Sequence, residues 1–370
     1  MRLNANALPF YHKLASVLVI LIGIGFLVII SKDLLSPIIF SCLFSILLLP
    51  LAAFLENRLK LPRGAASMLA VLLLLAAITL IVYVVGSQIG TLADDWPQFK
   101  QQVFSSLSDL QHWISRKYHI NAHKQLNYVQ SATSQVLSSG TSVVGATLLS
   151  LSSILLFLIF TFIYTFFFLT YRRLIMTFLV SVFLEENSLV VHDIVEKVQF
   201  ILRKYILGLF IEMIIVCTVV CIVFWALDVK YAILLGLITG LFNIIPYLGI
   251  FTALLLSSLI TFATAAVAGK VFLVIITLVI THLIDSNVLL PVIVGSKVKI
   301  NPLITVLGVV IGEMIWGISG MFLSIPVIAV MKIVFDRVES LKSWGLLLGE
   351  EERQSRKKAV VLTLENTPGE

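Results

Sequence analysis

The stretch that decides the fold reads Gly240-Leu241-Phe242-Asn243-Ile244-Ile245-Pro246-Tyr247-Leu248-Gly249, and it interrupts an apolar run from 231 to 263. A second run, from 303 to 334, is interrupted by Gly312-Glu313-Met314-Ile315-Trp316-Gly317-Ile318-Ser319-Gly320. Between them, an apolar segment carries a carboxylate in Ile284-Asp285-Ser286-Asn287. Lipid tolerates irregular backbone and ionisable side chains only where protein or a water-filled path surrounds them. Paired broken segments beside an intramembrane acid are typical of a transporter's binding site.

The composition places the chain in a membrane. Apolar residues make up 59% and charged residues 12%, against roughly 45–50% and about 25% in soluble proteins. The apolar runs come close to the ~20 residues that cross a ~30 Å hydrocarbon core. We therefore expect an all-α polytopic membrane protein with about eight hydrophobic segments, at 14–30, 34–54, 65–86, 144–170, 205–227, 231–263, 271–294 and 303–334. No small-residue cleavage site follows the first of them, so we take it as an uncleaved span.

The basic residues orient the chain. With eight spans and both termini in the cytoplasm, 18 of the 26 Lys and Arg residues lie on the inner side, as the positive-inside rule predicts. Re-entrant hairpins in place of the two broken spans satisfy the rule equally, so bent spans and hairpins stay open as alternatives. The net charge of +6 favours anionic lipids at the inner face rather than nucleic acid.

The polar stretches divide the chain into expected domains. The segment at 91–143 carries an apolar stripe at three- and four-residue steps, which predicts an amphipathic helical segment outside the membrane. We interpret this segment either as an external gate or oligomerisation arm, or as a helical hairpin that lies on the bundle, and both interpretations stay open. The expected domains are 1–90 (three transmembrane helices), 91–143 (external segment), 144–170 (fourth transmembrane helix), 171–204 (cytoplasmic connector helix), 205–335 (transport core) and 336–370 (cytoplasmic tail).

The two broken segments resemble each other. Gly240 and Gly249 have counterparts in Gly312 and Gly320 at offsets of 72 and 71 residues. Small residues at such spacing let helix backbones approach closely. Either a weak internal repeat or chance explains the match. The cysteines at 217 and 221 also lie one helical turn apart, and we interpret them as small packing residues rather than a metal or redox pair.

The first break offers polar groups inside the membrane. Pro246 removes one backbone donor and ends or kinks the helix, and Gly249 can adopt dihedrals that other residues avoid. The carbonyls thus freed, with Asn243 and Tyr247, are candidate ligands for a cation or a polar solute. A simple kinked span is the alternative, although Asn in so apolar a run needs a partner.

Acidic and polar residues elsewhere complete the candidate site. Thr281 and Asp285 share a helix face with Thr277, and Asp285 is either a charge-handling group or a structural Asp bonded to nearby backbone. A carboxylate without a partner at the depth of Glu212 favours its neutral form, which suits a proton-coupled carrier. An acid–lysine pair with Lys204 fits the same residues. The candidate binding residues are Asn243, Pro246, Tyr247, Gly249, Asp285, Asn287 and Glu313, supported by Glu212, Lys204, Thr281, His282, Gly312, Gly317 and Gly320.

These residues also carry a resemblance. The run 243–249 resembles the Ile-Pro-Tyr-x-Gly signature of the autoinducer-2 exporter family of bacterial permeases, and 284–291 with Asn301-Pro302 resembles its second signature. The run 317–326 resembles its third. The chain departs from the family pattern at Leu209, where Gln is common, and at Asn301, where His is more usual.

The resemblance implies transport across the inner membrane of a bacterium, by a multi-pass and homo-oligomeric protein. Some members export small polar signalling molecules, and Na⁺(Li⁺)/H⁺ exchange is attributed to others. We expect an ion-coupled secondary transporter, with cation/proton antiport and a non-transporting scaffold as alternatives. No cofactor is expected beyond coupling to H⁺ or Na⁺, since the chain has no Gly-x-x-x-x-Gly-Lys-Ser/Thr loop for ATP. It also lacks Gly-x-Ser-x-Gly and His-Glu-x-x-His, so we do not expect an enzyme.

Overall fold

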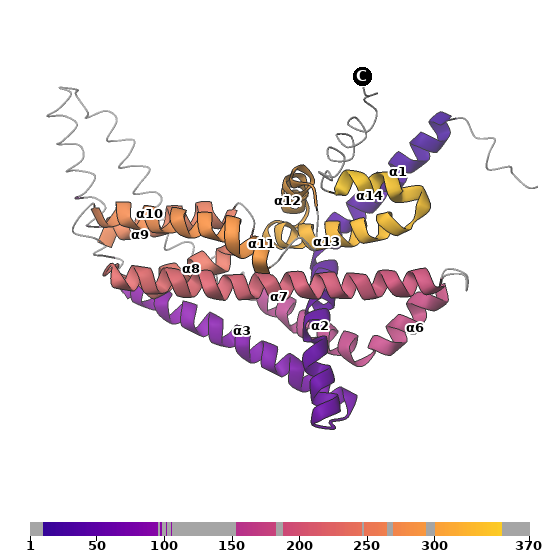
Figure 1. Cartoon of the computed structure of the whole chain (residues 1–370), viewed down its shortest axis with the longest axis horizontal. Coiled ribbons are helices and arrows are strands. Elements are labelled where there is room, and N and C mark those ends of the chain that lie inside the picture. Colours follow the sequence, from indigo (N-terminus) through magenta and orange to yellow (C-terminus); the bar gives the residue numbers. More distant parts are fainter. Residues whose placement is uncertain are drawn as a thin grey trace, which may run out of the picture. The chain divides into compact units, whose positions relative to one another are not determined.

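The computed structural model describes residues 10–94, 97, 101, 105, 153–182, 188–245, 248–264, 269–293 and 300–349. Helices account for nearly all of them, and within these ranges the extended pairing is a single bridge between Ile300 and Gly349. The expected all-α polytopic architecture is confirmed (Figure 1). The expected external segment at 91–143 lies almost wholly outside the described residues, as does the tail after Gly349.

The chain forms two compact units. The first comprises Met1–Ile175 and Ile206–Val294, and the second comprises Met176–Tyr205 and Gly295–Glu370. The helices are α1 (Phe10–Ile30), α2 (Lys32–Arg58), α3 (Arg63–Asp94), an unlabelled helix at Ser153–Thr170, α6 (Arg172–Val182), α7 (Ser188–Ala226), α8 (Ala232–Asn243), α9 (Leu248–Thr264), α10 (Gly269–Ile284), the π-helix η3 (Asp285–Leu289), α11 (Leu290–Ile293), α12 (Pro302–Trp316), α13 (Ile318–Arg337), the 3₁₀ turn η5 (Glu339–Leu341) and α14 (Lys342–Leu348).

Six of the described helical stretches are long and apolar enough to cross a membrane. They are α2, α3, Ser153–Thr170, α7, α10 extended through α11, and α13. The apolar part of α1, at Leu14–Ile30, is shorter, and so are α8, α9 and α12. Their lipid-compatible surfaces are consistent with a multi-pass membrane protein, because large apolar side chains stay exposed along nearly every helix.

In the part of the first unit that the structure describes, two cores hold the helices together. In one, α2 and α3 pack with Ser153–Thr170 around small residues such as Ala52, Ala66 and Ala70, all fully buried. Arg172 closes this group at its end by donating two hydrogen bonds, of 2.7 and 2.8 Å, to the carboxylate of Glu56. A bidentate pair of this kind fixes the orientation of both side chains.

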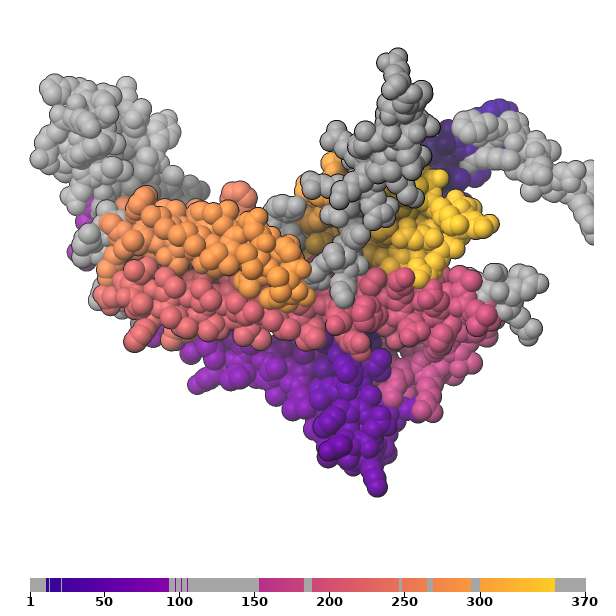
Figure 2. All heavy atoms as spheres, viewed as in Figure 1, coloured from indigo at the N-terminus to yellow at the C-terminus, as the bar shows by residue number. Residues whose placement is uncertain are grey.

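The other core joins α7, α8, α9 and α10. Its buried residues include Val216, Val220 and Phe224 from α7, with Leu235 from α8 and Leu278 from α10. Figure 1 shows α9 and α10 side by side along α7 (Figure 2 gives the same view with all atoms as spheres), and buried residues of α7, α8, α9 and α10 belong to one core. This core carries the site described below.

Glycines set how closely α8 approaches α7. A Cβ at Gly240 would lie 2.7 Å from the Cβ of Cys217, and one at Gly236 would lie 2.9 Å from the backbone nitrogen of Cys221. The two cysteines therefore pack against two glycines, and Cys221 also donates to the carbonyl of Ile233. This is the packing role that the sequence predicted for them.

Both broken segments are helical hairpins. The first divides into α8 and α9, of 12 and 17 residues, or about 18 and 25 Å at 1.5 Å per residue. The second divides into α12 and α13, of 15 and 20 residues, and these arms pack on each other. The alternative of continuous bent spans is therefore wrong, because the chain reverses at each break.

The predicted connector helix at 171–204 divides into two helices, and the second continues into the predicted fifth span. α6 covers its first part, and α7 runs without interruption through the rest of the connector and the span, for 39 residues. That corresponds to about 58 Å. Before it, the 11 residues of α6 have none buried, and exposed Leu174, Phe178 and Val182 follow one face at four-residue steps.

Helical structure in the second unit continues further along the chain than the sequence pattern predicts. Residues 336–370 are expected to form a solvated tail, but α14 packs back on α13, with Gly345 buried against Asp336. Lys332 donates to the carboxylate of Asp336 at 2.8 Å and to the carbonyl of Gly345. The small size of Gly345 permits this contact, so the tail is ordered structure as far as Gly349.

Candidate functional site in the core of the first unit

The first hairpin presents Asn243 at the end of α8. The amide of Ile245 donates to the carbonyl of Phe242 at 2.9 Å, and the amide of Gly249 donates to the carbonyl of Ile245 at 3.0 Å. A Cβ at Gly249 would lie 2.9 Å from the Cα of Asn243. Only glycine allows α9 to start this close to the end of α8. Pro246 and Tyr247 lie outside the described residues.

A π-helical turn presents Asp285. The regular hydrogen bonding of α10 changes at Asp285, and the amide of Leu290 donates to the carbonyl of Asp285. Such single π turns occur frequently at functional sites. Asp285 is 5% exposed, whereas its neighbour Asn287 faces outward and donates to the carbonyl of Leu283 at 2.8 Å.

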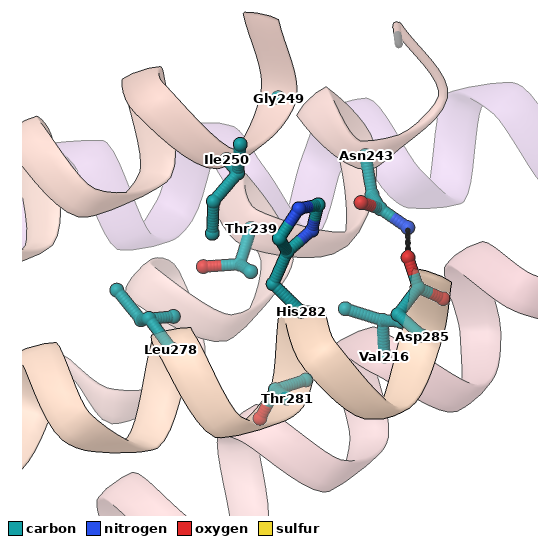
Figure 3. Close-up of a pocket in the computed structure, with 9 residues that line it drawn as sticks. All are labelled: Val216, Thr239, Asn243, Gly249, Ile250, Leu278, Thr281, His282 and Asp285. Carbon is teal, nitrogen blue, oxygen red and sulfur yellow. Dashed lines mark hydrogen bonds between the residues drawn. The ribbon is translucent and has the colours of Figure 1, made fainter. Parts of the chain in front are cut away.

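Asn243 joins two carboxylates from different helices. Its Nδ2 donates to Oε1 of Glu212, on α7, at 3.2 Å and to Oδ2 of Asp285 at 3.1 Å, the second bond being drawn in Figure 3. Glu212 is 3% exposed. Ionised carboxylates only accept hydrogen bonds, so the amide nitrogen has to face them. We call these three residues the carboxylate–amide cluster.

The cluster leaves two buried oxygens unsatisfied. Oε2 of Glu212 and Oδ1 of Asp285 have no hydrogen-bond partner among the described residues. Buried polar atoms are normally paired, because an unpaired one costs about 1–3 kcal/mol and a charged one more. The two free oxygens are therefore positions where a proton or another positive ligand would be stabilised.

A small cavity adjoins the cluster. Its volume is about 10 Å³, counted as the space available to the centre of a water molecule, which is room for about one water. In Figure 3 the imidazole of His282 points between Thr239 and Asn243. The residues lining the cavity are Val216, Thr239, Asn243, Gly249, Ile250, Leu278, Thr281, His282 and Asp285.

The structure also places the supporting residues. Nε2 of His282 lies 3.4 Å from the hydroxyl of Ser286, and its Nδ1 is buried without a hydrogen-bond partner among the described residues. Thr281 lines the cavity. Thr277, on the same predicted stripe, instead donates to the carbonyl of Leu273 in its own helix. Lys204 lies over the ring of Phe200, at 5.7 Å, while Glu212 bonds to Asn243.

The second break lies in the other unit. Backbone atoms of Gly312 and Gly320 touch, so that a Cβ on either would overlap the other. Gly317 has a φ of +64° and its amide donates to the carbonyl of Glu313 at 2.7 Å. The side chain of Glu313 is exposed. That this second break lies close to Asn243–Gly249 and to Asp285–Asn287 stays a prediction.

An ion pair lies at the loop before α8. Lys270 donates to the carbonyl of Asp228 at 2.6 Å and to its carboxylate at 2.8 Å. The hydrogen bond and charge of Lys270 lower the pKa of the Asp228 carboxyl. The contribution of this pair to stability is present above the unfolded-state pKa of about 3.9 and is lost as the pH falls through the lower folded-state value.

Asn301, where the chain departs from the family pattern, caps α12. Its side chain accepts from the amide of Leu303 at 2.9 Å, and its backbone amide donates to the carbonyl of Leu348. We expect Asn301→Ala to lower the free energy of unfolding by about 1 kcal/mol, measured as a shift in thermal unfolding. Ser31→Ala is the control, since Ser31 precedes α2 without a side-chain cap bond. Equal shifts in the two variants would contradict the capping role.

Sequence reasoning ranked Glu212 only as a supporting residue. A usable signal was present, since Glu212 shares one buried face of α7 with Val216 and Val220 at four-residue steps. On α8, buried Thr239 precedes Asn243 in the same way. Aligning the polar positions of these buried faces indicates that Glu212 and Asn243 point into one core.

Comparisons with known proteins agree with this architecture. The profile of the family described as "AI-2E family transporter" matches residues 14–340. "AI-2 transport protein TqsA" of Escherichia coli is 23% identical over 94% of this chain and 97% of its own length. "Putative transport protein YueF" of Bacillus subtilis is 25% identical over 84% and 85%. YrrI of B. subtilis, also named a transport protein, is 35% identical over 36% of this chain and 37% of its own length. The chain therefore belongs to the AI-2E family of membrane transporters.

Proposed function

We propose that this protein is an ion-coupled secondary transporter that exports a small polar solute across the inner membrane, with both termini in the cytoplasm. One observation supports ion coupling most strongly: two buried carboxylates, on α7 and in the π turn, meet one amide at the end of a hairpin. Intramembrane carboxylates are expensive, and they mark ion and proton pathways. The relative TqsA is named an AI-2 transport protein, which makes AI-2 the first solute to test.

The cluster offers a means of coupling. Asn243 ties the α8–α9 hairpin to α7 and to the π turn through two hydrogen bonds. A positive ligand bound to the carboxylates weakens the hydrogen bonds that they accept from the Asn243 amide, because it partly neutralises their negative charge. Ligand occupancy and hairpin attachment thus bias each other, which is the reciprocity that coupled transport requires.

Na⁺(Li⁺)/H⁺ antiport is the second candidate. Carboxylate oxygens suit hard cations, and the free oxygens of Glu212 and Asp285 are such ligands. The Glu313 side chain and the Gly312–Gly320 contact of the second hairpin complete the proposed machinery, as a further charge and as a hinge. A homo-oligomer fits the lipid-exposed helices, and anionic lipids at the inner face fit Arg173 and the exposed apolar stripe of α6.

Flux measurements in proteoliposomes test the proposal. We expect efflux of AI-2 to depend on an imposed ion gradient, and we expect Asp285→Asn to reduce gradient-driven flux at least tenfold. Glu339→Gln, which neutralises an exposed carboxylate outside the cluster, is expected to leave flux unchanged. Proton movement driven by a Na⁺ gradient without any solute would favour antiport. Equal flux in Asp285→Asn and wild type would refute transport through this cluster, and wild-type flux no higher than that of protein-free liposomes would support a scaffold.

A further inference from the structure

We infer that Glu212 and Asp285, the two carboxylates that Asn243 bridges, share one proton, and that this proton is the coupling ion. The inference rests on the proposed transport function. The two accepting oxygens lie 3.2 and 3.1 Å from one amide nitrogen. They are therefore no more than 6.3 Å apart, the sum of these distances. Two carboxylates this close in a water-poor core oppose each other's ionisation, so one proton between them relieves the repulsion.

The described residues of the helices around the cluster supply no fixed positive charge. Neither α8 nor α9 contains a charged residue, and neither does α11. On α7, the residues from Leu207 to Ala226 include no charge other than Glu212. On α10 the one titratable group facing the cavity is His282, while Lys270 is paired with Asp228. The negative charge of the pair must therefore be neutralised by something that binds.

The orientation of the Asn243 side-chain amide favours a proton over a metal cation at the cluster. A cation ligated by both carboxylates would sit between them, and that position holds the NH₂ group of Asn243. An amide NH₂ carries partial positive charge and donates, so it repels a cation there. A proton needs no such space, because it binds at Oε2 of Glu212 or Oδ1 of Asp285, which are both unpartnered among the described residues.

The size of the cavity points the same way. About 10 Å³ accommodates one water at most, so this conformation has no room for an organic solute beside the cluster. His282 lines the cavity, and its Nε2 faces the hydroxyl of exposed Ser286 at 3.4 Å. Imidazole can accept a proton at one nitrogen and release one at the other. His282 and Ser286 thus connect the cavity beside the cluster to the helix surface.

Infrared difference spectroscopy on the full-length protein in nanodiscs tests the inference without any solute. A shared proton gives a carbonyl-stretch band of a protonated carboxyl at neutral pH. We expect the band to shift in both Glu212→Gln and Asp285→Asn, because each variant removes one of the two acids that share the proton, and to disappear when the two substitutions are combined. Glu339→Gln is expected to retain it. Two single variants, each checked by size-exclusion chromatography, keep the test decisive when one of them misfolds.

Three results would overturn the inference. The first is no protonated carboxyl at any pH from mildly acid to mildly alkaline. The second is a band that keeps its position in both single variants or survives in the double variant, which assigns it to other groups. The third is loss of the wild-type band when Na⁺ replaces choline at constant pH, which assigns the site to a cation. An intact band in a protein that moves no solute would instead refute the proposed transport while leaving the proton site standing.

Discussion

Asn243→Leu is expected to abolish ion-coupled transport and to lower the stability of the protein. Leucine has a similar volume but donates nothing, so two bonds to carboxylates are lost. Hydrogen bonds to charged groups contribute about 1.5–3 kcal/mol each. Two buried acids are then left without a donor, and the α8–α9 hairpin loses its polar attachment to α7 and to the π turn. We expect at least a hundredfold loss of coupled flux in proteoliposomes.

Asn57→Leu provides the matched control for this result. Asn57 is exposed near the end of α2, so the same chemical change there removes no buried bond. Its flux and thermal unfolding are expected to equal those of the wild type. Coupled flux in Asn243→Leu at the wild-type rate would show that the bridging amide has no part in transport.

Gly320→Ala is expected to disrupt the second hairpin. A Cβ at Gly320 would overlap the backbone carbonyl of Gly312 and lie 3.1 Å from the Cβ of Trp316. The neighbour is backbone rather than a flexible side chain, so α12 and α13 have to separate. Overpacking of this kind costs about 1–3 kcal/mol or more, and we expect thermal unfolding to shift down by several degrees with reduced accumulation in the membrane.

Gly86→Ala separates this effect from the general consequences of replacing glycine in an apolar helix. No described residue comes within 4 Å of a Cβ at Gly86, and alanine has the higher helix propensity. We therefore expect unchanged or slightly higher stability. Similar losses in Gly86→Ala and Gly320→Ala would argue against the backbone contact as the cause.

The all-α class and the order of the apolar segments followed from the sequence, because the length of an apolar run indicates whether it can cross a membrane. The choice between bent spans and hairpins did not follow, because both satisfy the charge distribution. It depends on whether glycine backbones meet, as Gly312 and Gly320 do. The repeat is partly supported, since Gly249 closes its own hairpin as Gly320 does, whereas Gly240 packs against Cys217 of α7.

The candidate site was predictable in its residue types but not in its pairing. Asn243 and Asp285 are predicted site residues because polar groups in apolar runs need partners. In the structure, Nδ2 of Asn243 lies 3.1 Å from Oδ2 of Asp285. The second carboxylate that Asn243 joins, Glu212, lies 31 residues before it. Periodicity assigns a residue to a face but gives no contact between helices. The position of Asp285 also depends on a π turn, which no simple pattern predicts.

The π turn at Asp285–Leu289 implies that this helix can absorb a change in length of one residue. A helix advances about 100° per residue, so an extra residue wound regularly would turn everything after it to a new azimuth. The wider π turn takes up that residue instead, and Leu290 through Ile293 keep the direction that a regular helix one residue shorter would give them. Relatives that lack one residue between Ser286 and Leu289 should therefore wind regularly here and present the same face of α11 to their neighbours.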